Sequence, residues 1–223
     1  MKALYDSPWH HPFLTYLAGA VLLFALARRL PFLYAYLFVF LVIILADANV
    51  TGGWSPVPID TPLYTALSVV FIILGDFRYF LLAERATRPK ASFGAVLAFS
   101  VPISLLLPVS TGILTRTVDA FSDTRVLYAA YELTMVVVVL GLDRVRFSAR
   151  DVDPSVRRWV HEVSLLFGAL YFGWGACDLL LLAGVELGHG LRIVPNVLYY
   201  GALLPFIFWR APPEWKALQR SQA

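Results

Sequence analysis

Four acidic side chains lie within or at the edge of long apolar stretches of this sequence: Asp47, Asp76, Glu132 and Asp178. A charged side chain at the centre of a membrane costs about 2.5–3.5 kcal/mol even on the lenient insertion scales. A helix surface that faces lipid has nothing to offset this cost. We therefore expect these acids, together with Arg78, to face one another or a watery cavity inside a helix bundle, and we expect that cavity to be the functional site.

Asp76, Asp178 and Glu132 are the candidate catalytic residues, because a carboxyl group serves as a general acid or base when its surroundings tune it. Asp178 follows a run of small residues, and Trp174 lies one helical turn before it on the same face. A carboxylic acid in a dry site against an aromatic wall suits a proton donor. The structural alternative is that these acids only form ion pairs between helices.

Polar and aromatic side chains near the acids are the candidate substrate-binding residues: Asp47, Asn49, Tyr128, Trp174, Tyr199, Tyr200 and Arg78. Arg78 stands two residues after Asp76, so it points to a different face of its helix. We expect its guanidinium either to reach the membrane interface or to pair with Asp143.

The segments that carry these residues are apolar enough to cross a membrane. The chain has 223 residues, of which 59% are hydrophobic and 15% charged, whereas a soluble domain carries roughly 25% charge. We predict an all-α, polytopic integral membrane protein, a single domain over residues 1–223 that forms a bundle of seven transmembrane helices. The predicted spans are residues 13–27, 31–48, 61–83, 92–115, 124–142, 159–184 and 193–209. Pro102, Pro108 and Pro205 lie inside spans and should kink them.

The basic residues orient the bundle. Most arginines and lysines fall in loops on one side, from Arg28 and Arg29 to Arg210 and Lys216. The positive-inside rule predicts an N-terminus outside and a C-terminus in the cytoplasm, and we predict residence in the bacterial inner (cell) membrane. Since Arg28 and Arg29 follow the first apolar stretch, it lacks the charge order of a signal peptide. Tryptophans near the span ends are assigned to the interfacial aromatic belt: Trp9, Trp54, Trp159 and Trp215.

The sequence contains no pattern typical of a metal or cofactor site. His10, His11, His161 and His189 do not form a metal-ligand spacing on one helix face, and Cys177 is the single cysteine. The phosphate loop and the His-Glu-x-x-His motif are both absent. The net charge of +3 is explained by topology, so we expect neither a metal, a cofactor nor nucleic acid as a partner.

Much of residues 65–205 resembles the integral membrane lysoplasmalogenases, small multi-span proteins with a Gly-Asp in an early helix and a second Asp in a late one. The matching motifs are residues 68–76, ending in Gly75-Asp76, residues 126–130 with Met135, residues 168–172, residues 176–180 around Asp178, and residues 197–202. Cys177 stands where the family usually has serine, Leu203 replaces a glutamine, and the helix after Gly75-Asp76 lacks the family's histidine.

The resemblance implies hydrolysis of the vinyl ether bond of a lysoplasmalogen, with Asp178 and Asp76 as the acid/base pair. Such a bond opens when its carbon is protonated and water adds, so a carboxylic acid and a carboxylate that holds water suffice. The expected partners are therefore the membrane and a lipid or another hydrophobic small molecule.

The same buried acids and aromatic side chains fit other functions. A membrane-integral isoprenoid cyclase also needs a strong acid in an aromatic pocket. A proton-coupled transporter of small molecules would use the acids as a proton relay. A structural subunit would pair them with Arg78, Arg116 and Arg144.

Overall fold

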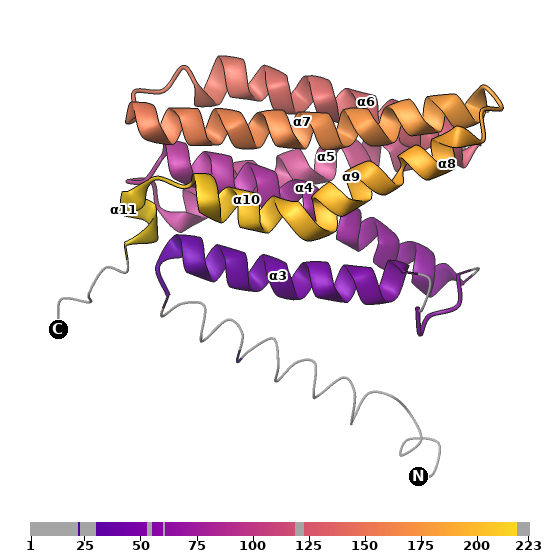
Figure 1. Ribbon diagram of the computed structural model, residues 1–223, viewed down its shortest axis with the longest axis horizontal. Coiled ribbons are helices and arrows are strands. Elements are labelled where there is room, and N and C mark those ends of the chain that lie inside the picture. Colours follow the sequence, from indigo (N-terminus) through magenta and orange to yellow (C-terminus); the bar gives the residue numbers. More distant parts are fainter. Residues whose placement is uncertain (1–21, 23–29, 53–54, 60, 119–122, 218–223) are drawn as a thin grey trace, which may run out of the picture.

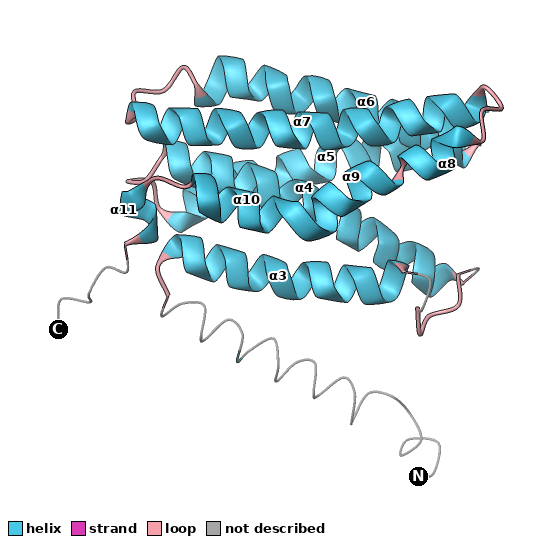
Figure 2. Ribbon diagram, in the orientation of Figure 1, coloured by secondary structure: helices cyan, strands magenta, loops and turns pink. Residues whose placement is uncertain are grey.

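The computed structural model describes residues 22, 30–52, 55–59, 61–118 and 123–217. Over these ranges the chain is helical, without a strand (Figure 2). The elements are α3 (Phe32–Thr51), α4 (Pro62–Thr87), α5 (Phe93–Thr117), α6 (Thr124–Leu142), η3 (Asp143–Phe147), α7 (Pro154–Leu182), α8 (Leu187–Leu191), α9 (Ile193–Val197), η4 (Leu198–Ala202), α10 (Leu203–Arg210) and α11 (Pro213–Lys216).

The predicted all-helical, membrane-like class is confirmed. Six segments of the described chain are long and apolar enough to cross a membrane: Phe32–Thr51, Pro62–Thr87, Phe93–Leu114, Arg125–Phe147, Pro154–Leu182 and Leu187–Arg210. They match the last six predicted spans. The first predicted span, 13–27, lies outside the described residues apart from Leu22.

The six segments run side by side along the long axis (Figure 1). α7 occupies a central place, since it packs against α6, α4, α9 and α10. α10 also contacts α3, and α4 contacts both α3 and α5. The acidic residues therefore lie on helices that meet in the middle of the bundle.

Side-chain caps fix where several helices begin. The Thr61 hydroxyl accepts from the Tyr64 amide at 3.2 Å, and the Ser92 hydroxyl accepts from the Ala95 amide at 3.2 Å. The Asp153 carboxylate accepts from the Ser155 amide at 2.7 Å and from the Ser155 hydroxyl. These hydrogen bonds hold the pKa of the Asp153 carboxyl below its usual range.

The predicted start of the span at residue 159 was therefore too late. The apolar pattern begins at Trp159, whereas the helix begins at Pro154, directly after the Asp153 cap. Trp159 consequently lies more than a turn inside α7. It is 1% exposed, and its Nε1 donates to the Ile207 carbonyl oxygen at 3.0 Å. Its assignment to the aromatic belt was wrong, while Trp9 and Trp54 lie outside the described residues.

The last span, predicted over residues 193–209, is helical throughout but irregular. α9 and α10 are joined by the π-helical stretch η4, and the Leu203 amide donates to the Leu198 carbonyl. Pro205 has no N–H, so it cannot complete the α-helical ladder at this point. Figure 1 shows the chain changing direction between α9 and α10. By contrast, α5 continues through Pro102 and Pro108 as one helix.

Replacement of Trp159 by phenylalanine should destabilise the bundle by about 1–3 kcal/mol, because a smaller ring leaves space in the core and the Ile207 carbonyl loses one of its two donors, keeping the Ala211 amide. Thermal unfolding in detergent, followed by circular dichroism, measures this. Trp209→Phe is the matched control, since the Trp209 side chain is 75% exposed. Equal unfolding temperatures for the two variants would contradict the structural role of the Trp159 hydrogen bond.

Candidate functional site

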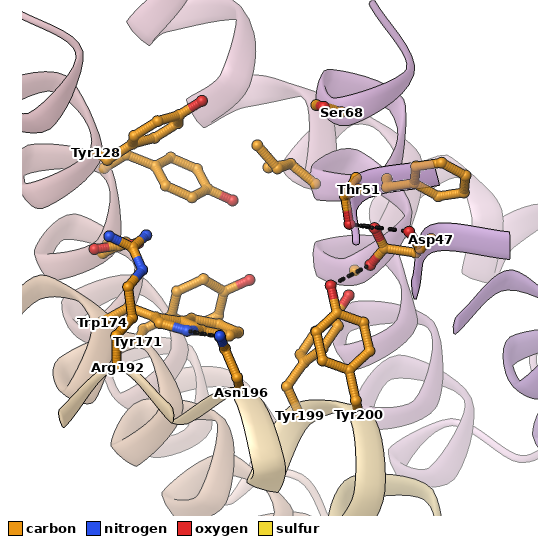
Figure 3. A pocket seen from close by; sticks show the side chains of 15 residues that line it. Asp47, Thr51, Ser68, Tyr128, Tyr171, Trp174, Arg192, Asn196, Tyr199 and Tyr200 are labelled. Carbon is orange, nitrogen blue, oxygen red and sulfur yellow. Dashed lines mark hydrogen bonds and ion pairs between the residues drawn. The ribbon is translucent and has the colours of Figure 1, made fainter. Parts of the chain in front are cut away.

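A cavity of about 280 Å³ lies between α3, α4, α6, α7 and the first part of the last span (Figure 3). Much of its wall is aromatic. The ring-bearing lining residues are Phe71, Tyr128, Tyr131, Tyr171, Trp174, Tyr199 and Tyr200. Its ionisable lining residues other than the tyrosines are Asp47, Glu132 and Arg192. This combination of an apolar wall and a few charged groups is typical of a small-molecule site.

Asp47 forms one corner of the cavity. It is 5% exposed, and both carboxylate oxygens accept hydrogen bonds. The Thr51 hydroxyl, one turn further along α3, donates to Oδ1 at 2.9 Å, and the Tyr200 hydroxyl of η4 donates to Oδ2 at 3.2 Å (Figure 3). The predicted residues Asp47 and Tyr200 are thus brought together.

Asp76 is held by two phenols that line the cavity. The Tyr131 hydroxyl of α6 donates to its Oδ2 at 2.7 Å, and the Tyr171 hydroxyl of α7 donates to its Oδ1. The Asp76 side chain is buried on α4. One carboxylate therefore fixes the phenol groups of two other helices at the edge of the cavity.

Glu132 and Asp178 meet at the side chain of Arg192. Arg192 donates to Asp178 Oδ1 through Nη1, and its Nη2 lies 3.6 Å from Glu132 Oε1. Arg125 Nη1 reaches the same Asp178 oxygen at 3.4 Å. Glu132 Oε2 and Asp178 Oδ2 are buried without a hydrogen-bond partner in the described part of the chain. Glu132 lines the cavity, whereas Asp178 is fully buried behind its wall.

The two aspartates of the predicted acid/base pair have different partners. Asp76 is bound by tyrosines and Asp178 by arginines, and no hydrogen bond or ion pair joins them in the described residues. Among the predicted substrate-binding residues, Tyr128, Trp174 and Tyr199 also line the cavity. Trp174 Nε1 donates to Asn196 Oδ1 at 2.8 Å.

Two predicted residues lie elsewhere. Asn49 is exposed on α3, and its amide donates to the Leu45 carbonyl at 2.7 Å, so it is bound to its own helix. Arg78 neither reaches the interface nor pairs with Asp143. It is 1% exposed, with its guanidinium 4.6 Å from the Tyr199 ring centroid.

The expectation for Arg78 was wrong because its helix face is turned into the bundle. Asp143 has other partners, His161 Nδ1 at 2.6 Å and the Ser164 hydroxyl at 3.2 Å. The Arg78 guanidinium instead lies against the aromatic rings of Tyr199 and Phe167. Its Nε and Nη2 have no hydrogen-bond partner among the described residues.

Sequence reasoning missed several lining residues. Arg192 was not among the predicted site residues, although it is the basic group closest in sequence to the start of the last span. Tyr131 is adjacent to Glu132, and that adjacency was an available signal. Thr51 follows Asp47 by one helical turn, and that spacing was also an available signal. Tyr171 had no such signal, because its partner Asp76 is 95 positions away in the sequence.

The cavity combines one carboxyl group with an unpartnered oxygen, phenols fixed by a second carboxylate, and a guanidinium. An arrangement of this kind can donate and accept protons and can orient a polar group. No three His, Cys, Asp or Glu side chains of the described ranges gather closely enough to hold a metal ion. Searches of family models, curated proteins and solved structures found no match to this chain.

Gly75 lets the Tyr199 phenol approach α4 at the cavity. A Cβ atom at Gly75 would stand 2.9 Å from Tyr199 Oη, whereas one at Gly141 would meet nothing within 4 Å. Replacement of a helical glycine by alanine normally stabilises by about 0.5–1 kcal/mol. We expect this gain for Gly141→Ala, and no gain or a loss for Gly75→Ala, in thermal unfolding measurements. An equal gain for both variants would contradict the contact between Tyr199 and Gly75.

Proposed function

We propose that this chain is a membrane-embedded acid/base hydrolase that cleaves an ether bond of a lipid. The substrate that the family resemblance favours is the vinyl ether of a lysoplasmalogen. The observation that carries the proposal is the Glu132 carboxyl group, which lines an aromatic cavity with its Oε2 unpartnered within the described chain. The Arg192 guanidinium lies 3.6 Å from Oε1, so only Oε2 remains for a ligand in the cavity, and a buried oxygen without a partner is costly.

Glu132 is the proton donor in this proposal. Its proton moves to the vinyl carbon that does not bear oxygen, and the ether oxygen shares its lone pair to give an oxocarbenium ion. Water adds to the oxygen-bearing carbon and returns a proton to Glu132. The hemiacetal then breaks its bond to the ether oxygen, which takes the hydroxyl proton. One water is consumed, and an aldehyde and the glycerol alcohol are released.

The remaining lining groups have supporting roles. Tyr131 and Tyr171 present phenol oxygens to the cavity, where they can hold the attacking water, and Asp76 positions both phenols. Asp178 positions Arg192 beside Glu132. Asp47 and the tyrosine rings supply negative charge and π-faces that stabilise an oxocarbenium ion. Asp178 therefore acts through Arg192 rather than on the substrate itself.

The proposed site lies in the outer half of the bundle. The loops rich in arginine and lysine, at residues 88–92 and 143–153 and after α10, follow the opposite ends of the helices that line the cavity. The positive-inside rule then places that opposite end in the cytoplasm and the C-terminus with it. We propose the bacterial inner membrane as the location and a lipid as the partner, without nucleic acid.

Lipid mass spectrometry on the purified protein tests the proposal. A mixed lysolipid extract is incubated with the wild type and with Glu132→Gln, Asp76→Asn and Asp178→Asn. We expect wild type to consume a lysoplasmalogen, and Glu132→Gln to lose about a hundredfold or more in rate, the scale of a lost general acid. Asp178→Asn should retain more activity than Glu132→Gln.

Glu186→Gln is the matched control, because the Glu186 side chain is 89% exposed on the same half of the molecule. Its rate should equal that of wild type. Turnover of a different lipid would support an enzyme activity but exclude a lysoplasmalogen as its substrate. No change in any lipid would refute the hydrolase proposal.

A proton-coupled transporter of small molecules is the second candidate, and the π-helical irregularity of the last span favours it. The π-helical stretch η4 interrupts this span at Tyr199 and Tyr200, which line the cavity. Transporters commonly place discontinuous helices at their substrate sites. Uptake into vesicles that depends on a pH gradient, with every lipid unchanged, would select this alternative.

A further inference from the structure

Three arginines converge on one buried carboxylate at the end of α4 opposite the cavity. Glu84 is 0% exposed, and its carboxylate lies 3.0 Å from Arg88 Nη1, 3.2 Å from Arg146 Nη2 and 3.0 Å from Arg150 Nη2. Arg146 also donates through Nε at 3.2 Å. We name Glu84, Arg88, Arg146 and Arg150 the Glu84 cluster.

The charges within the Glu84 cluster do not balance. One carboxylate compensates one guanidinium, so two positive charges remain in excess. The carboxylate is buried, whereas the arginine side chains are 41%, 34% and 18% exposed for Arg88, Arg146 and Arg150. The excess positive charge therefore faces outward from the bundle.

Packing holds these guanidinium groups in place. The Arg146 guanidinium lies 3.9 Å from the Phe99 ring centroid. Arg150 donates to the Thr87 hydroxyl and lies 5.7 Å from the Phe147 ring centroid. Like charges held close together repel each other, and fixed guanidinium groups are pre-organised for a ligand because little side-chain freedom is lost on binding. The excess positive charge on fixed guanidinium groups therefore favours the binding of an anion.

The length of α4 places the cluster at the level of the lipid headgroups. Its 26 residues extend about 39 Å at 1.5 Å per residue, which exceeds a hydrocarbon core of roughly 30 Å. Glu84 stands in the last turn of α4.

We propose that the Glu84 cluster binds the phosphate group of an anionic phospholipid in the leaflet at this end of the bundle. Guanidinium groups match phosphate oxygens through paired N–H donors. Glu84 sets the spacing of the three arginines, and the lipid supplies the missing negative charge. This site is separate from the cavity and does not depend on the proposed hydrolase function.

Thermal unfolding of the purified full-length chain in neutral detergent, titrated with short-chain phosphatidylglycerol or phosphatidylcholine, tests the proposal. We expect phosphatidylglycerol to stabilise the wild type more than phosphatidylcholine does. Arg146→Gln should weaken the apparent affinity for phosphatidylglycerol about fivefold, the loss expected for one arginine at a membrane surface. Arg88→Gln, the most exposed member, provides the same test if Arg146→Gln does not fold.

Arg144→Gln is the matched control. Arg144 is exposed and lies in η3, the same stretch as Arg146, but it does not belong to the Glu84 cluster. Its replacement by glutamine removes the same charge as Arg146→Gln. Its affinity for phosphatidylglycerol should equal that of wild type.

Three results would overturn the proposal. An equal loss in Arg144→Gln would show diffuse surface attraction instead of a site. An equal effect of phosphatidylcholine and phosphatidylglycerol would remove the need for an anion. If inorganic phosphate stabilises the protein as much as phosphatidylglycerol does at the same concentration of phosphate groups, the ligand is free phosphate and not a lipid.

Discussion

The need to give every buried charge a partner governs this bundle. Water is excluded from the middle of a membrane protein, so an ionised group there is stable only when other side chains take the place of the water. Asp76 uses two phenols, Asp178 two arginines, and Glu84 three arginines. Asp143 uses His161 and Ser164.

Because most of these partners stand on different elements, satisfying the charges also fixes how the helices meet. Asp76 connects α4 to α6 and α7 through two short polar contacts. Arg192, at the beginning of the last span, connects that span to α7 and α6. Apolar packing alone distinguishes poorly between neighbouring rotations of a helix in lipid, whereas a carboxylate accepts few geometries. The polar contacts therefore add specificity to a largely apolar interface.

The helices were predictable from the sequence, whereas the partners of the buried charges were not. The spans were predictable because apolar runs and caps are local: residues 124–142 match α6 at both ends. The burial of acids in apolar runs was predictable from the free-energy cost of exposing a charge to lipid. All four are buried: Asp47, Asp76, Glu132 and Asp178. Their partners were not predictable, because a residue pair such as Asp76 and Tyr171 is separated by 95 positions.

The pairing of Arg78 with Asp143 failed for a related reason. Both residues were assigned to the same end of the bundle, and charge alone made them plausible partners. In the structure His161 and Ser164 of α7 hold Asp143, while the Arg78 guanidinium lies against the rings of Tyr199 and Phe167. Charge alone could not choose among these partners, because only the folded bundle sets which face of each helix meets its neighbours.

Buried polar atoms without a hydrogen-bond partner support the cavity as the candidate site. Among the ionisable residues, Glu132 Oε2, Asp178 Oδ2 and two nitrogens of Arg78 are buried without a hydrogen-bond partner in the described chain, as is the Ser100 hydroxyl. A folded protein accepts such a cost where something else compensates it, such as an ordered water, an ion or a bound ligand. Glu132 is the one of these residues that also lines the cavity. Its incomplete satisfaction, beside phenols that Asp76 holds in place, is therefore the strongest structural support for acid/base chemistry at this position.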